Sequence, residues 1–204
     1  MKTGNKLKNF TQGQARQYLD QRNDKIQGGL FWRQLDFFAG LVMVVLLALC
    51  LRAVIGEPAD VRGSSMEDTL QEGDYILLDK LSYIFSPMER GDVVICYYPG
   101  TWDHTCVKRV IGLPGEQVDI INGQVYINGE ALKEGYLTRV PRNNHDGSWV
   151  VEEGTVFVLG DNRLVSKDST HPEVGCIPQE KVLGRVRCRI LPLSQIRTFG
   201  HWAY

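Results

Sequence analysis

The sequence predicts a mainly β domain that follows one transmembrane helix. An apolar run near the N-terminus, residues 37–55, carries a single charge, Arg52. From residue 59 onward, short runs rich in Val, Ile and Tyr alternate with Gly, Asp and Pro, which is typical of strands and turns. With 204 residues, 43% of them hydrophobic, the chain is long enough for one globular domain beside the helix.

The apolar run has the length of a membrane span. Phe37–Ile55 contains 19 residues, and a helix of that length, rising about 1.5 Å per residue, nearly crosses a hydrocarbon core of about 30 Å. A cleavable secretory signal and a buried core helix are the alternatives. More than thirty mostly polar residues precede the run, unlike the short basic start of a secretory signal. We therefore predict a transmembrane helix over residues 35–55.

The segment before the helix is basic, and this predicts its side of the membrane. Before residue 36 there are two acidic residues and seven basic ones: Lys2, Lys6, Lys8, Arg16, Arg22, Lys25 and Arg33. Because basic flanks stay in the cytoplasm, residues 1–34 are predicted to be a cytoplasmic tail. Residues 57–204 are then an extracytoplasmic domain. Gly28 and Gly29 interrupt the tail, and we expect the part before residue 30 to be weakly structured.

The predicted strands follow one another along the rest of the chain. They cover residues 75–78, 92–97, 106–111, 118–127, 155–159 and 181–190. The fourth of these ranges contains a hairpin, because Asn122-Gly123 lies between alternating apolar residues and Asn128-Gly129 follows it. Residues 130–150 are polar. We expect residues 116–155 to form a hairpin excursion from the main domain.

The charge and the cysteines exclude some classes of function. A formal net charge of −1 gives no reason to expect a nucleic-acid partner. His104 and Cys106 have the spacing of some metal ligands, but no second pair accompanies them, so we predict neither metal nor cofactor. The five cysteines lack a framework spacing. Cys96 and Cys106 flank a predicted hairpin and are either a disulfide or two buried thiols.

Ser65 and Lys108 are the candidate catalytic residues. Ser65 lies in Gly63-Ser64-Ser65-Met66, a pattern typical of a tight turn. Lys108 lies in an apolar, strand-like run, where desolvation can lower the pKa of a lysine and free its amine as a base. A lysine can replace histidine as the base that activates a serine. Either residue alone is more often a turn serine or a solvated lysine.

Four motifs give the chain a resemblance to bacterial type I signal peptidases. Ser65–Leu70 resembles the family's Ser-Met-x-Pro-Thr-Leu, and Gly91–Val94 resembles a strand motif. Lys108–Gly115 matches the lysine motif throughout, and Gly160–Ser169 resembles Gly-Asp-Asn-Arg-x-x-Ser-x-Asp-Ser. The motifs occur in the family's order and the resemblance covers roughly residues 35–192.

The resemblance implies a fold, an activity and partners. It implies a signal-peptidase-like β domain in a single-pass protein of the cell membrane. The implied activity is that of a serine endopeptidase with a Ser/Lys dyad. Such an enzyme would remove signal peptides from secretory preproteins after small-x-small motifs such as Ala-x-Ala. Secretory preproteins and the lipid bilayer are the implied partners.

The resemblance also assigns roles to individual residues. Ser65 becomes the nucleophile and Lys108 the general base, while the hydroxyl of Ser166 orients the lysine amine. Asp168 is expected to pair with Arg109, which follows the base in sequence. This pair would hold the two segments in register.

The oxyanion and substrate contacts are less directly indicated. The backbone N–H of Ser65 is expected to donate to the oxyanion together with a second group. Some family members have a hydroxyl side chain where this chain has Gly63, so backbone amides or Ser64 must serve. Ser64 would point away in an extended segment. Met66 is expected to line the shallow pockets for small substrate side chains.

Two positions depart from the family pattern. Asp68 replaces the proline that would preset φ after the nucleophile. Thr170 stands where the family usually has arginine, so that a second ion pair to Asp168 is missing or comes from elsewhere. Two other functions remain as alternatives: a related Ser/Lys peptidase with a dedicated or self-cleaved substrate, and a membrane-tethered β module without catalysis. Loss of Ser65 or Lys108 would have indicated the second.

Overall fold

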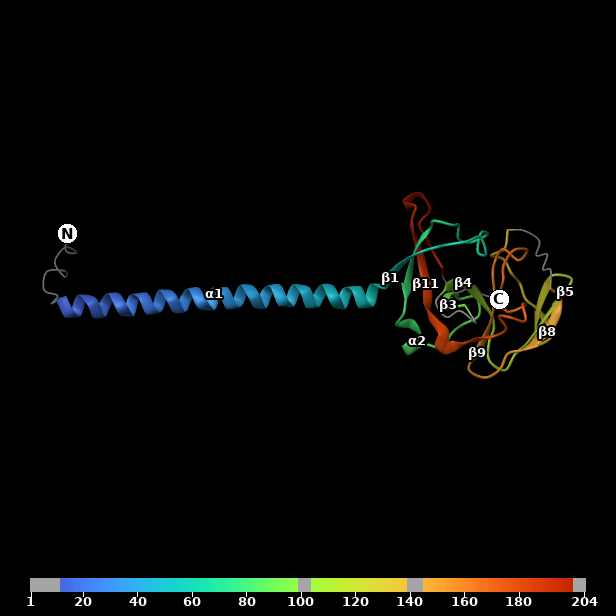
Figure 1. Ribbon diagram of the computed structural model, residues 1–204, viewed down its shortest axis with the longest axis horizontal. Coiled ribbons are helices and arrows are strands. Elements are labelled where there is room, and N and C mark those ends of the chain that lie inside the picture. The colour runs from blue at the N-terminus through green and yellow to red at the C-terminus, as the bar shows by residue number, and fades with distance from the viewer. Residues whose placement is uncertain (1–11, 99–103, 139–144, 200–204) are drawn as a thin grey trace. The chain divides into compact units, whose positions relative to one another are not determined.

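The computed structural model describes residues 12–98, 104–138 and 145–199. The chain divides into two compact units, Met1–Leu51 and Arg52–Tyr204. The first contains most of the long helix α1 (Gln12–Ile55), and the second contains all of the strands (Figure 1).

Helix α1 includes the predicted membrane span. Within it, Trp32–Cys50 is long and apolar enough to cross a membrane. The helix begins at Gln12, so the expectation of a weakly structured tail is wrong for residues 12–29. A helical glycine costs only about 1 kcal/mol relative to alanine. The Gln, Arg, Lys and Leu residues around Gly28 and Gly29 favour a helix, and an existing helix extends more easily than a new one forms.

The main sheet of the second unit is antiparallel and has eight strands. Their order is β1-β2-β11-β3-β4-β9-β10, and β12 pairs with β11. The bounds are β1 (Glu57–Asp60), β2 (Tyr75–Asp79), β3 (Val93–Tyr97), β4 (Thr105–Gly112), β9 (Thr155–Leu159), β10 (Ile177–Pro178), β11 (Val182–Leu191) and β12 (Arg197–Thr198). Short helical turns are α2 (Ser82–Phe85), η1 (Gln179–Lys181) and η2 (Leu193–Gln195). These strands confirm the predicted mainly β fold.

Residues between β4 and β9 form a second, four-stranded sheet. It comprises β5 (Gln117–Ile121), β6 (Gln124–Ile127), β7 (Glu130–Ala131) and β8 (Gly147–Val150), in the order β7-β6-β5-β8. Asn122 and Asn128 each have a φ of 51°, and Gly123 and Gly129 have φ values of 81° and 85°. Positive φ at both turn positions is what an Asn-Gly hairpin requires, and it confirms the two predicted turns.

One hydrophobic core joins the two sheets. Ile111 of β4 and Phe157 and Leu159 of β9 pack with Val118 and Ile120 of β5. The sheets approach closely at one point in the lysine motif, since a Cβ atom on Gly112 would lie 2.6 Å from Val118 Cγ2. Strand β4 therefore lies between β3 and β9 within the main sheet and also supports the second sheet.

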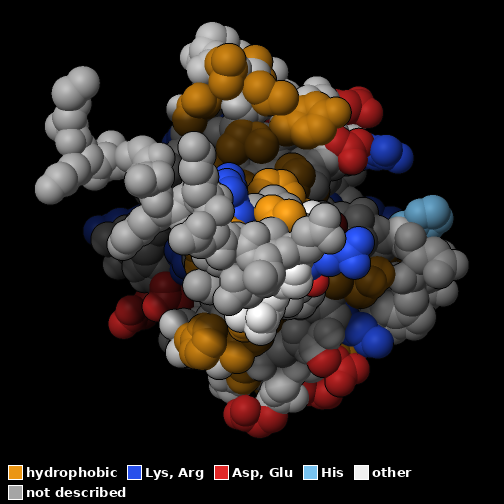
Figure 2. All heavy atoms as spheres, turned by 90° about the vertical axis from the view of Figure 1, so that its left-hand side faces the viewer, with side chains coloured by type: hydrophobic (Ala, Val, Ile, Leu, Met, Phe, Trp, Pro, Cys, Tyr) orange, Lys and Arg blue, Asp and Glu red, His pale blue; other side chains and the backbone are white. Residues whose placement is uncertain are grey.

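Apolar side chains are also exposed on the second unit. Leu191 at the end of β11, Leu193 in η2 and Ile196 after it are exposed. In Figure 2, which looks along α1 from its N-terminal side, hydrophobic side chains gather at the upper margin of the molecule.

Candidate active site

Strand β4 buries Lys108 beside a serine. Lys108 lies opposite Val94 of β3 and is 3% exposed. Its Nζ donates a hydrogen bond to Ser166 Oγ at 3.1 Å. The alternation of β4 directs this side chain to the face opposite its neighbour Arg109. The structure thus brings together the two residues that were predicted to act as base and orienting hydroxyl.

Ser65 begins a tight turn that is fixed by its neighbours. Within this turn, Thr69 N and Leu70 N donate to the Met66 carbonyl at 2.7 Å and 2.6 Å. Met66 and Leu70 are buried in the core beside β2 and β3, whereas Ser65 is half-buried. Buried anchors directly after a half-buried serine suit a nucleophile that must be rigid and accessible.

The turn after β9 holds the backbone of this serine. The N–H of Asn162 donates to the Ser65 carbonyl at 2.9 Å, and Asn162 Nδ2 donates to the Ser64 carbonyl at 3.0 Å. A Cβ atom on Gly160 would come within 2.5 Å of both the Ser65 carbonyl oxygen and Ser166 Oγ. Ser65 and Ser166 are therefore near neighbours, separated by a residue that has no side chain.

Arg109 makes its ion pair with Asp161 and not with the expected Asp168. Arg109 Nε donates to Asp161 Oδ1 at 2.9 Å and Nη2 donates to Oδ2 at 2.7 Å, with the side chains 2% and 0% exposed. The register of the sheet explains the choice. Arg109 lies opposite Leu159 of β9, and Asp161 follows that strand by only two residues.

Asp168 has a different function in the structure. Its carboxylate accepts hydrogen bonds from Gly160 N at 3.0 Å and from Thr170 Oγ1 at 2.8 Å. The hydroxyl of Thr170 therefore supplies a partner where the family usually has arginine. Asp168 holds the Gly160 turn against the segment that carries Ser166.

The residues named for oxyanion and substrate contacts lie in different environments. Gly63 is exposed, with a φ of +82°, so a residue with a side chain would be strained there. Ser64 lies in a bend and is half-buried. Met66 is 1% exposed, and its sulfur accepts from Asp161 N at 3.5 Å. The expected contact of Met66 with substrate is wrong, because the turn after Ser65 directs this side chain into the core.

Thr69 connects the serine motif to the buried ion pair. Its Oγ1 donates to Asp161 Oδ2 at 2.5 Å and accepts from Arg109 Nη2 at 3.2 Å. Thr69, Asp161 and Asn162 all lie within the motifs that carried the resemblance, but the sequence alone assigned them no role. Their partners come from other motifs, so no signal within a single motif could have found them.

Cys96 and Cys106 face each other across β3 and β4. Their Sγ atoms are 3.6 Å apart and both thiols are free, since a disulfide bond measures about 2.05 Å. The hydrogen bond with Cys106, together with burial, raises the pKa of the Cys96 thiol. Within the described residues, no cluster of three or more His, Cys, Asp or Glu side chains could hold a metal ion. His104 and His145 are exposed, His171 is half-buried, and His201 lies outside the described residues.

A cavity of about 290 Å³ lies beside the first half of β4, just before Lys108 in the strand. Strand β1 is at the end of the main sheet, and β9 pairs with β4 through Arg109, Val110 and Gly112. The cavity lies between β1 and the first half of β4, and its lining residues are Ala59, Asp60, Arg62, Ile95, His104, Thr105, Cys106 and Val107. An extended peptide could enter there beside both strands.

Comparison with known proteins identifies the family. The family described as signal peptidase, peptidase S26, matches residues 34–191. The chain is 35% identical over 171 residues to a probable signal peptidase I-1 of Synechocystis sp., covering 80% of this chain and 86% of that protein. It is 35% identical over 172 residues to signal peptidase I T of Bacillus subtilis, covering 80% and 88%.

A solved structure is also similar. The crystal structure of a signal peptidase I from Enterococcus faecalis is 32% identical to the chain, covers 49% of this chain and 97% of that one, and has a TM-score of 0.43. The family match and the two relatives confirm the resemblance that the four motifs indicated. The chain therefore belongs to the signal peptidase family, peptidase S26.

Proposed function

We propose that this protein is a membrane-anchored serine endopeptidase that removes signal peptides from secretory preproteins, with Ser65 as nucleophile and Lys108 as general base. The observation that carries the proposal is the burial of Lys108 within hydrogen-bond distance of Ser166, next to the turn that begins with Ser65. Membership of the signal peptidase family supports the substrate class.

The arrangement supports a two-step acyl transfer. Ser65 Oγ attacks the scissile carbonyl carbon while the neutral Lys108 amine takes the hydroxyl proton. The amine returns this proton to the leaving nitrogen as the peptide bond breaks, which leaves an ester on Ser65. Water, deprotonated by Lys108, then hydrolyses the ester and regenerates the hydroxyl. One N–H of Lys108 donates to Ser166 Oγ, which directs the lone pair of the amine.

The negative charge on the tetrahedral intermediate needs donors on the opposite side from the base. The backbone N–H of Ser65 is one donor in this proposal, because the peptide follows a turn at Gly63 with a φ of +82°. The bond from Asn162 Nδ2 to the Ser64 carbonyl, which belongs to the same peptide, fixes that peptide plane from its other side. A preorganised donor of this kind contributes about 3–4 kcal/mol to the stability of the transition state.

The geometry of a strand explains a small-x-small requirement. A preprotein segment that adds beside β1 and the first half of β4 would be extended. Alternate side chains of an extended segment point to the same face. The first and third residues before the scissile bond would therefore meet the walls of the 290 Å³ cavity, while the second points away. Walls close to the backbone admit only small side chains.

In this proposal, the membrane helix holds the enzyme at the bilayer, where signal peptides also lie. Trp32–Cys50 is apolar enough to cross a bilayer, and the basic residues before it favour a cytoplasmic N-terminus with the Ser65 domain outside. A signal peptide is itself anchored in the bilayer, so a shared membrane raises the effective concentration of substrate. The exposed Leu191, Leu193 and Ile196 are suited to contact with lipid.

The test is cleavage of a secretory preprotein by the detergent-solubilised full chain. The product should have a new N-terminus directly after a small-x-small sequence, as mass spectrometry would show. The Ser65→Ala variant should leave the preprotein intact. Cleavage by that variant, or no cleavage by a folded wild-type enzyme, would contradict the proposal.

A further inference from the structure

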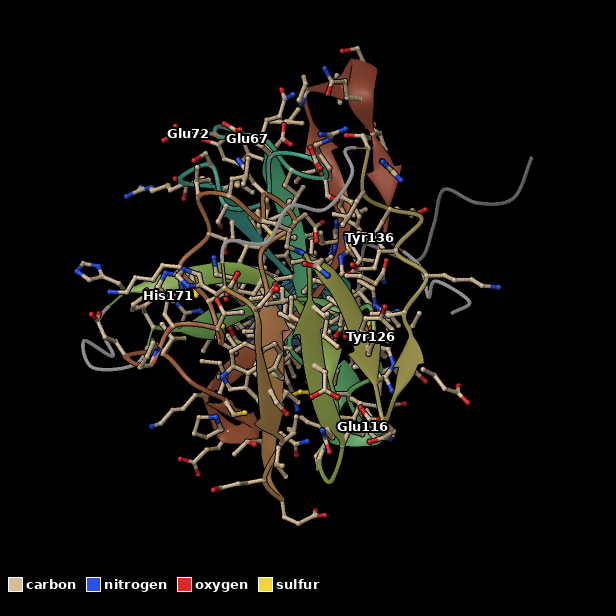
Figure 3. All side chains as sticks on the ribbon, turned by 90° about the vertical axis from the view of Figure 1, so that its right-hand side faces the viewer. Glu67, Glu72, Glu116, Tyr126, Tyr136 and His171 are labelled. Atoms are coloured by element: carbon tan, nitrogen blue, oxygen red, sulfur yellow. The ribbon has the colours of Figure 1, made fainter. Side chains whose placement is uncertain are left out.

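Glu134 and Tyr136 of the second sheet's β7–β8 connection contact two arginines from the active-site motifs. Arg163 Nη1 donates to Glu134 Oε2 at 3.1 Å, and Arg163 Nη2 pairs with Glu134 Oε1. The Tyr136 hydroxyl donates to Glu134 Oε1 at 2.5 Å and accepts from Arg163 Nη2 at 3.3 Å. Tyr136 is labelled in Figure 3. The connection thus binds the Gly-Asp-Asn-Arg motif through the side chains of Glu134 and Tyr136.

Arg163 also binds the backbone of Gly160, which lies between Ser65 and Ser166. Its Nε donates to the Gly160 carbonyl at 3.0 Å, while Asp168 accepts from the Gly160 N–H at 3.0 Å. Gly160 is held on both sides of its backbone in this way. It is also the residue that separates Ser65 from Ser166. A displacement of Arg163 would therefore move the backbone that lies between the Ser65 carbonyl and Ser166 Oγ.

Tyr136 also contacts Arg109, which lies in β4 next to the proposed base Lys108. The Cζ atom of Arg109 lies 3.9 Å from the centroid of the Tyr136 ring, a cation–π distance. Arg109 directly follows Lys108 in β4, and it pairs with Asp161 in the turn that holds Ser65. The ring therefore covers the ion pair that joins the lysine motif to that turn.

The charges on this cluster are retained despite burial. The side chains of Arg163 and Glu134 are 3% and 4% exposed. Burial by itself lowers the pKa of Arg163, but the charge of Glu134 outweighs it and raises the pKa above its usual range. Burial, together with the charge of Glu134, raises the pKa of Tyr136, which stays a neutral donor.

A buried ion pair of this kind is a poor source of stability. Replacing such a pair with apolar residues of similar volume is often neutral or stabilising, because desolvation of both charges offsets their attraction. Its hydrogen bonds instead specify one geometry. In this chain the pair holds Arg163 where it can bind the Gly160 carbonyl.

We propose that Glu134 and Tyr136 are positioning residues for the peptidase reaction. They hold Arg163 and Arg109 in place, and these arginines set the mutual placement of Ser65, Lys108 and Ser166. The inference rests on the proposed function, since it assigns a role in that reaction. It makes the four-stranded sheet a part of the catalytic scaffold.

The test replaces the ion pair and leaves the volume nearly unchanged. The variant is Glu134→Met/Arg163→Met in the full chain, in detergent. Its matched control is Arg90→Met/Glu116→Met, because Glu116 and Arg90 also form a two-bond ion pair at the second sheet, with distances of 2.5 Å and 2.8 Å. Figure 3 shows Glu116 well apart from Tyr136.

The expected result is a lower kcat, with KM and Tm nearly unchanged. In the Glu134/Arg163 variant, kcat for a short peptide should fall about 10- to 100-fold, as small misplacements of reacting groups do. KM and Tm should stay near the wild-type values. The control should keep its kcat within about twofold. A kcat equal to that of the control, at comparable Tm, would overturn the proposal.

A second measurement does not need activity. Amide hydrogen exchange at Asn162 reports the bond between its N–H and the Ser65 carbonyl. Exchange at Asn162 should accelerate about tenfold in the Glu134/Arg163 variant and not in the control, because local opening becomes easier. Unchanged exchange would overturn the positioning role. An inactive wild-type enzyme would instead refute the proposed function, and the exchange result would still decide this inference.

Discussion

Lys108 Nζ lies 3.1 Å from Ser166 Oγ, and Gly160 lies between Ser166 and the Ser65 carbonyl. Three segments that are distant in sequence therefore meet around Ser166 and Gly160, a residue without a side chain. Strand β4 contributes the amine, the turn after β1 contributes the nucleophile, and the turn after β9 contributes the hydroxyl. Catalysis should depend on each of these placements separately.

Removal of the nucleophile or of the base should abolish cleavage. Ser65→Ala and Lys108→Ala should each lower kcat by about 10³-fold or more, as in other serine hydrolases. Lys108→Arg should be equally inactive, because a guanidinium stays protonated and cannot accept a proton. Preprotein cleavage measures the effect, and circular dichroism checks the fold. Wild-type turnover by a folded variant would rule out the dyad.

The rate should rise as the pH is raised from acid into the alkaline range. A lysine accepts the serine proton only in its neutral form, so deprotonation of Lys108 increases the active fraction of the enzyme. The measurement is kcat/KM for a short peptide over this range, at pH values where Tm is constant. A flat profile would argue against a lysine base.

Gly160→Ala should inactivate the enzyme. The added Cβ atom would come within 2.5 Å of Ser166 Oγ and of the Ser65 carbonyl oxygen, and the latter belongs to the backbone and cannot swing away. We expect kcat to fall about 100-fold or more and Tm to fall as well. The control is Gly40→Ala in α1, where nothing lies within 4 Å of the added atom. An active Gly160→Ala enzyme would show that the three segments are not in close contact.

Asp79 should stabilise the protein above pH 4 and stop doing so near pH 2. Burial raises the pKa of this carboxyl, but hydrogen bonds from Ser82, Arg187 and two backbone amides outweigh it and lower the pKa from 3.8 to about 2. A depressed native pKa means that the contribution is complete above the unfolded value and is lost as the pH falls through about 2.

The measurement compares Asp79→Asn with the wild type by urea unfolding at several pH values. Arg187 is half-exposed, so solvent screening limits the difference in unfolding free energy to about 1 kcal/mol at pH 6. The two proteins should approach the same stability near pH 2. A difference that does not depend on pH would assign the effect to packing.

The domain from residue 57 onward should be accessible from outside the cell. Protease added to intact cells with a permeable wall should digest this domain and spare residues 1–34, because basic flanks remain in the cytoplasm. Immunoblots against tags at the two ends provide the measurement. Digestion of the N-terminal tail together with protection of the domain would reverse the orientation.

Some features could be predicted from the sequence because a few adjacent residues determine them. The Asn122-Gly123 and Asn128-Gly129 turns need positive φ, and this preference belongs to the residues themselves. The length and apolarity of residues 37–55 likewise predicted a membrane helix. The motifs around Ser65 and Lys108 placed the chain in its family.

Other features were decided only by the tertiary structure. The sequence led us to expect Asp168 as the partner of Arg109, and the pairing of β4 with β9 brought Asp161 there instead. Met66 is buried because the turn after Ser65 rotates it into the core. Glu134 and Arg163 are 29 residues apart, and no periodicity brings them together. Contacts of this kind depend on strand register and on the packing of one sheet against another, which no local run of residues encodes.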